Sequence, residues 1–93
     1  MRTIERTTQF KRDYKREMKG RHRASLQADL TAVLTELAAD RPLAARLRDH
    51  ALTGNWADHR DCHVKPDLVL IYRLAGTETL QLVRLGSHAE LGF

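Results

Sequence analysis

Histidine and aspartate alternate between His59 and His63, with Asp61 midway between the two imidazoles. Together with the apolar run that follows Pro66, this pattern predicts a strand, a turn and a second, buried strand. Successive side chains of a strand point to opposite faces of a sheet, so His59, Asp61 and His63 would share one face. Such a face could transfer protons near neutral pH, because histidine is the side chain best suited to that role.

RNA cleavage by phosphodiester transfer would use these residue types. It needs a base for the 2′-hydroxyl, an acid for the leaving 5′-oxygen and cations for the phosphate. The histidines and aspartates, with His50 and His88 added, could supply the first two, and Arg84 in the last predicted strand the third. Spacing alone does not decide the matter, since scattered polar residues on a solvated face explain it at least as well.

A metal site is the competing enzymatic interpretation. His59, His63 and Asp67 follow one another at intervals of four residues, which resembles a set of metal ligands. That interval brings side chains together only on a helix. Pro66 and the apolar strand after it disfavour a helix, so we expect acid–base chemistry with no metal and no cofactor.

The remaining elements must place these residues on one sheet. The pattern predicts a strand at Arg2–Arg6, a helix after Thr7 or Thr8 that ends near Gly20, a helix at Ser25–Ala39, and a last strand at Thr79–Gly86. In that last strand, even alternation would put Val83 and Leu85 on one face and Arg84 on the other. The order β-α-α-β-β-β indicates an α+β fold with a helix pair on one face of a mostly antiparallel sheet.

Composition indicates an ordinary soluble chain with one domain, residues 1–93. No apolar run approaches the roughly 20 residues of a membrane helix, and a single cysteine, Cys62, fits a reducing cytoplasm. Residues 1–23 hold nine Lys and Arg against three Asp and Glu. A basic end on a chain with a pI of about 9.7 favours a polyanionic partner, although a solvated helix face explains it equally well.

Several motifs occur together and in order. They are Asp49-His50, Leu52-Thr53-Gly54-Asn55-Trp56, Arg60-Asp61-Cys62-His63-Val64-Lys65-Pro66-Asp67, Leu70-Ile71-Tyr72, and Arg84-Leu85-Gly86-Ser87-His88-Ala89-Glu90-Leu91. In this order and spacing, the chain resembles the YafQ-type branch of the RelE toxin superfamily over nearly its whole length. That family is similar in fold to compact microbial ribonucleases.

The resemblance implies a metal-independent messenger-RNA endonuclease that acts at the ribosome and is neutralised by a cognate antitoxin. His50, His63, Asp67 and His88 match the family's catalytic positions, with His88 as the expected general acid. His63 and Asp67 would act on or orient the 2′-hydroxyl, with His50 assisting. By the same resemblance Arg84 and Phe93 would contact the substrate. The family usually has an aromatic residue directly after the leucine of the tail, but here Gly92 precedes Phe93. The alternative is an inactive toxin-like module that only binds an antitoxin or RNA.

Overall fold

A computed structural model describes every residue of the chain, from Met1 to Phe93. Its elements are β1 (Thr3–Arg6), α1 (Thr8–Glu17), α2 (Leu26–Ala38), the 3₁₀ turn η1 (Ala45–Leu47), β2 (His50–Ala51), the 3₁₀ turn η2 (Gly54–Trp56), β3 (Arg60–Lys65), β4 (Leu68–Ala75), β5 (Thr79–Gly86) and α3 (His88–Leu91). One sheet contains all the strands in the order β1-β5-β4-β3-β2. Only the β1–β5 pair is parallel. The predicted α+β fold is therefore confirmed.

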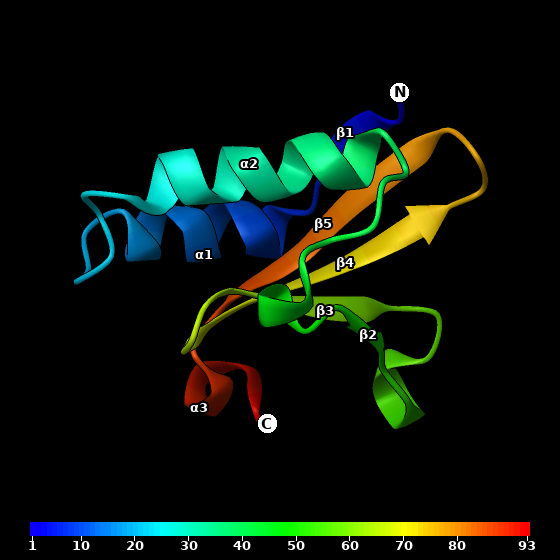
Figure 1. Cartoon of the computed structure of the whole chain (residues 1–93). Helices are drawn as coiled ribbons and strands as arrows, with labels where there is room; N and C mark the ends of the chain where they lie inside the picture. Colours follow the sequence, from blue (N-terminus) through cyan, green and yellow to red (C-terminus); the bar gives the residue numbers. More distant parts are fainter.

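Helices α1 and α2 lie side by side over one face of the sheet (Figure 1). Thr7 begins α1 as predicted, because its hydroxyl oxygen accepts a hydrogen bond from the backbone amide of Phe10 at 3.0 Å. The apolar stripes of both helices then meet the inward residues of β3, β4 and β5. The buried members of this main core are Phe10, Leu26, Leu30, Val33, Leu37, Ala38, Leu47, Cys62, Val64, Leu68, Leu70, Tyr72, Leu80, Leu82 and Leu85.

A smaller apolar cluster covers part of the opposite face. It consists of Val69, Ile71 and Leu91, with Leu52, Trp56 and Val83 packed against them. Strand β4 is thus buried on both faces, which explains its uninterrupted apolar run. Helix α3 lies on this second side of the sheet, away from α1 and α2 (Figure 1). The cluster leaves room beside it for polar side chains of β3 and α3.

The even alternation predicted for the last strand is wrong beyond Leu82. Ile71 of β4 pairs with Arg84, whereas the next residue, Tyr72, pairs with Leu82, so Val83 is an extra residue in β5. A bulge of this kind reverses the faces of the residues that follow it. Leu85 consequently joins the main core and Val83 joins the smaller cluster.

Two elements go beyond the predicted order. Strand β2 adds His50–Ala51 to the sheet edge through pairing with β3. The tail forms α3, whose start is fixed by a capping box: Ser87 accepts from the amide of Glu90 at 3.2 Å, and Glu90 accepts from the amide of Ser87 at 2.9 Å. Both additions place a histidine, His50 or His88, at the edge of an ordered element. None of the helices has the length and apolar character needed to cross a membrane.

Candidate active site

Strand β3 presents Asp61 and His63 on the face opposite the main core. The intervening Cys62 and Val64 are buried among the core residues, as the alternation predicted. His59 precedes the strand and does not join this face. Its ring lies edge-on to Trp56, with centroids 5.4 Å apart, and its Nδ1 is 3.0 Å from the carbonyl oxygen of Ala57.

His88 and Asp67 form the best-defined polar pair of the site. Asp67 Oδ1 lies 2.7 Å from His88 Nδ1 and accepts from the His88 backbone amide at 3.2 Å. The hydrogen bonds from His88, followed by the charges of His88 and Arg21, lower the pKa of Asp67. An ionised carboxylate can only accept, so Nδ1 of His88 must carry the hydrogen. This leaves Nε2 of His88 available to a substrate.

His63 faces this pair from the neighbouring strand. The rings of His63 and His88 lie edge to face, with centroids 5.0 Å apart. His63 has no hydrogen bond to its ring from elsewhere in the chain, and its side chain is half-buried. The turn between β3 and β4 and the start of α3 therefore bring His63, Asp67 and His88 together.

Asp61 connects His50 to the other histidines. The residue is 4% exposed, and its Oδ1 lies 3.0 Å from His50 Nδ1. That nitrogen is also 2.8 Å from the carbonyl oxygen of Arg48, which receives the hydrogen bond, so Asp61 Oδ1 is left without a donor. Burial raises the pKa of Asp61, and the nearby His50, His63 and His88 only partly oppose this. The three imidazoles thus share one buried carboxyl as a neighbour.

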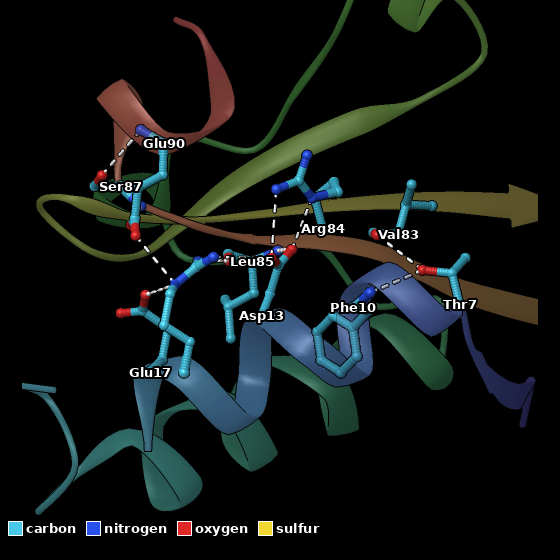
Figure 2. Close-up of polar contacts among 10 residues, drawn as sticks. Thr7, Phe10, Asp13, Glu17, Val83, Arg84, Leu85, Ser87 and Glu90 are labelled. Carbon is cyan, nitrogen blue, oxygen red and sulfur yellow. Dashed lines mark hydrogen bonds and ion pairs between the residues drawn. The ribbon is translucent and has the colours of Figure 1, made fainter. Parts of the chain in front are cut away.

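The two predicted substrate contacts lie differently. Arg84 is bound to the buried Asp13 of α1: its Nε donates to Asp13 Oδ2 at 2.7 Å and its Nη2 to Oδ1 at 3.3 Å (Figure 2). Its guanidinium forms no hydrogen bond with a histidine. Phe93 is 47% exposed, and its backbone amide donates to the carbonyl oxygen of His88 at 2.9 Å. Gly92, with φ 80°, makes this C-terminal turn and sends the Phe93 ring to solvent.

Asp13 is a residue that the sequence analysis missed. It accepts hydrogen bonds from Arg84, from the Leu85 amide at 3.0 Å and from Arg16 at 3.1 Å. Arg16 in turn donates to the Leu85 carbonyl at 2.8 Å and pairs with Glu90 of α3 at 3.0 Å. This network fastens α1 to the part of β5 that leads into α3. The available signal was helical spacing, because Asp13 lies three residues after the buried Phe10.

No group of three or more His, Cys, Asp or Glu side chains is arranged to hold a metal ion. The rival ligand set, His59, His63 and Asp67, is divided among a loop, a strand and a turn. The arrangement that is present is one of imidazoles and carboxyls in mutual contact, which suits proton transfer.

A family model described as "Bacterial toxin of type II toxin-antitoxin system, YafQ" matches residues 2–92. The mRNA interferase toxin YafQ of Escherichia coli K12 is 48% identical over 50 residues, which are 54% of this chain and 53% of that protein. The chain spans about half the length of the curated relatives that it matches.

Solved structures match over almost the whole chain. The E. coli DinJ–YafQ complex contains a chain that is 38% identical, with a TM-score of 0.83 and 98% of both chains covered. A metal-bound toxin from Helicobacter pylori is 44% identical, with a TM-score of 0.84 and coverage of 98% of this chain and 99% of that one. The resemblance to YafQ-type toxins inferred from the sequence is confirmed.

Proposed function

Since the chain belongs to the YafQ family of bacterial type II toxins, we propose that it is an mRNA endoribonuclease that cleaves by attack of the 2′-hydroxyl, without a metal ion. The observation that carries this proposal is the His88–Asp67 pair at 2.7 Å with the His63 ring beside it. Cleavage needs a base and an acid at one phosphate. Two neighbouring imidazoles, one of them oriented by a carboxylate, can fill these two roles.

His88 is the proposed general acid. Asp67 accepts its Nδ1–H and so orients the ring, and a proton on Nε2 can pass to the 5′-oxygen as the bond from phosphorus to that oxygen breaks. We assign Asp67 to orienting His88, because the carboxylate oxygen nearest the site is already engaged by the ring and the amide of that residue.

His63 is the proposed base. Its ring forms no hydrogen bond within the chain, so it can take the proton of the 2′-hydroxyl while the 2′-oxygen bonds to phosphorus. The products are a 2′,3′-cyclic phosphate and a free 5′-hydroxyl. His50 would assist from the far side of Asp61, with its Nδ1–H directed to the Arg48 carbonyl and its Nε2 open to the substrate.

Arg84 and Phe93 are the proposed substrate contacts. Asp13 occupies the Nε and Nη2 groups of Arg84, which leaves Nη1 for a phosphate oxygen. Phe93 is held by its backbone beside His88 and is exposed, so its ring is free to stack on a base.

The partners follow from the relatives and from the charge distribution. We propose that a cognate antitoxin binds this chain in a hetero-oligomer, as DinJ does with YafQ in the E. coli complex. The basic face of α1, with Lys11, Arg12 and Lys15, and the exposed Lys19 just after the helix would contact ribosomal RNA in a salt-sensitive manner. The place of action would be the cytoplasm, where messenger RNA is translated.

The proposal is tested by inducing the protein in bacterial cells, mapping cut sites in messenger RNA, and repeating the cleavage with purified protein and translating ribosomes. We expect His88→Gln to lower the cleavage rate about 10²- to 10⁴-fold, because a positioned proton donor contributes that much. His22→Gln, in the link between α1 and α2, is the matched control and should cleave normally.

Full activity of His88→Gln would reject the assigned acid. The metal-free mechanism would be rejected if purified protein, treated with EDTA and freed of the chelator before it meets magnesium-containing ribosomes, had lost a bound metal and its activity. A wild-type protein that cuts nothing yet binds its antitoxin would instead identify a toxin-like binding module.

A further inference from the structure

A hollow of about 380 Å³ lies beside His63 and His88, between η1, the end of β3 and the turn at Pro66. We propose that this hollow binds a backbone phosphate of the RNA, adjacent to the scissile one, through Arg46 and Arg48. The inference rests on the proposed function, because it names where the same substrate continues beyond the histidines.

The hollow is lined by cations and by no carboxylate. Arg46, Arg48 and Lys65 all contribute to its wall. Lys65 is already engaged, since its Nζ lies 2.5 Å from Asp29 Oδ2 and 2.6 Å from Ser25 Oγ. Arg46 and Arg48 are exposed and form no ion pair, unlike Arg60 and Arg84 elsewhere on the sheet. Two free guanidinium groups at one hollow are suited to the paired oxygens of a phosphate.

The backbone of Arg48 is fixed in an uncommon conformation. Its φ of 50° and ψ of 44° lie in the left-handed region, which residues other than glycine seldom occupy. Its amide donates to the Ala45 carbonyl at 3.1 Å, and its own carbonyl lies 2.8 Å from His50 Nδ1. One residue therefore both orients a histidine of the proposed site and lines the adjacent hollow. A backbone held in this way fixes where the Arg48 side chain begins, at the wall of the hollow.

The position of the hollow favours RNA over an acidic protein segment as its occupant. His63 and His88 line it directly, so a chain whose scissile phosphate lies between these two rings continues past them. Its neighbouring phosphate then meets Arg46 and Arg48. Contacts of this type position a nucleic acid and do not read its sequence.

The test is binding of a fluorescent single-stranded RNA with every 2′-hydroxyl methylated, so that it cannot be cut, measured by anisotropy between about 50 and about 200 mM salt. We expect the Arg46→Gln/Arg48→Gln double variant to bind about tenfold more weakly at low salt. Its plot of log affinity against log salt should be shallower by about 0.7, the value for one released phosphate contact on a single strand. The single variant Arg48→Lys, which keeps the positive charge, should retain most of the wild-type affinity for this RNA.

Arg41→Gln is the matched control. Arg41 is an exposed arginine after α2, paired with Glu36 at 2.6 Å and outside the hollow, and its replacement changes the net charge by the same one unit as the single variant Arg48→Gln. Equal weakening by Arg41→Gln and Arg48→Gln would overturn the inference, as would failure of the wild type to bind at low salt. Variants that bind RNA normally but lose affinity for the antitoxin would also overturn it and would identify an acidic protein segment as the occupant.

If the proposed nuclease function is wrong, the outcome differs from that expected when only the phosphate site is wrong. The wild type would then leave messenger RNA uncut on ribosomes, whatever the RNA-binding data show. If it does cut, the double variant should raise KM and change kcat little, because the arginines do not touch the reacting atoms.

Discussion

Two aspartates are buried in this protein, Asp13 on α1 where that helix meets β5 and Asp61 on β3, and their surroundings are opposite. Asp13 is fully buried and accepts hydrogen bonds from two guanidinium groups and one backbone amide. Asp61 is 4% exposed, and its Oδ1 has no hydrogen-bond donor. Asp13 therefore has hydrogen-bond donors for both carboxylate oxygens, whereas Asp61 has none for Oδ1.

The pKa values of the two carboxyls shift in opposite directions. Burial raises the pKa of Asp13, but hydrogen bonds from Arg84 and the Leu85 amide, with the charges of Arg84 and Arg16, outweigh it and lower the pKa. Burial also raises the pKa of Asp61, and the histidines around it do not outweigh that effect. Burying a carboxyl without donors costs folding free energy. We infer that Asp13 stabilises the fold and that Asp61 is retained for its neighbours, the three proposed active-site histidines.

The largest predicted effect is on the free energy of unfolding, and it tests the comparison of Asp13 with Asp61. We expect Asp13→Asn to lower the free energy of unfolding by about 2–4 kcal/mol, since it leaves two arginines without their shared counter-charge. The range is reduced from that of a fully buried pair, because the Arg16 and Arg84 side chains are 41% and 23% exposed. The measurement is urea unfolding followed by circular dichroism.

Asp61→Asn is the matched variant for this measurement. It should change the same free energy by less than about 1 kcal/mol, because no hydrogen bond to Oδ1 is lost. Equal losses in the two variants would mean that the two carboxyls serve the fold alike, and the comparison would fail.

The second effect is on the pH dependence of stability. The folded pKa of Asp13 is depressed, so its contribution is present above the ordinary aspartate pKa of about 3.9 and is lost as the pH falls through the folded value. The folded pKa of Asp61 is raised, so its contribution is greatest below about 3.9 and is lost as the pH rises through the folded value.

The unfolding free energy of the wild type, minus that of each Asn variant, should therefore change with pH in opposite directions. The difference should rise with pH for Asp13→Asn and fall with pH for Asp61→Asn. Urea unfolding over a series of acidic buffers measures both. Parallel curves would show that the environment of Asp61 is not the one described.

Much of the fold could be predicted from the sequence because it depends on local periodicity. The stripe of Leu26, Leu30 and Leu37 specifies α2, and the alternation of Asp61, Cys62 and His63 specifies the faces of β3. The bulge at Val83 was not predicted, since it arises from pairing with β4. The apolar positions change phase between Leu82 and Val83, but a strand buried on both faces gives the same pattern.

The same distinction applies to the candidate site: features that depend on motifs and strand order could be predicted, and contacts between distant elements could not. Its residue types and the convergence of His63, Asp67 and His88 followed from motif resemblance and strand order. The partners of Arg84 and Asp61 did not, because each depends on which side chain of a distant element comes within hydrogen-bonding distance. Asp13 is 71 residues from Arg84 in the chain, and in the sequence it is one acidic residue in a basic helix.

The smallest effect tests whether the Asp13 network is separate from Asp61 and its three histidines. It uses Gly86, the last residue of β5. A Cβ added there would lie 2.9 Å from Arg16 Nη2, so Gly86→Ala must push that guanidinium aside. Arg16 would lose its hydrogen bond to the Leu85 carbonyl, while Arg84 would keep Asp13. We expect a loss of about 1 kcal/mol in unfolding free energy, the value of one hydrogen bond.

Gly20→Ala is the control for the change of glycine to alanine itself, because a Cβ there would meet only the carbonyl oxygens of Glu17 at 3.5 Å and Arg16 at 3.9 Å, both ordinary contacts. It should be neutral or slightly stabilising, since alanine restricts the unfolded chain. Because Asp61 makes no contact with Arg16, the pH dependence assigned to Asp61 should be the same in Gly86→Ala as in the wild type. A change in that dependence would show that the Asp13 network extends to the histidines and that the two aspartates belong to one system.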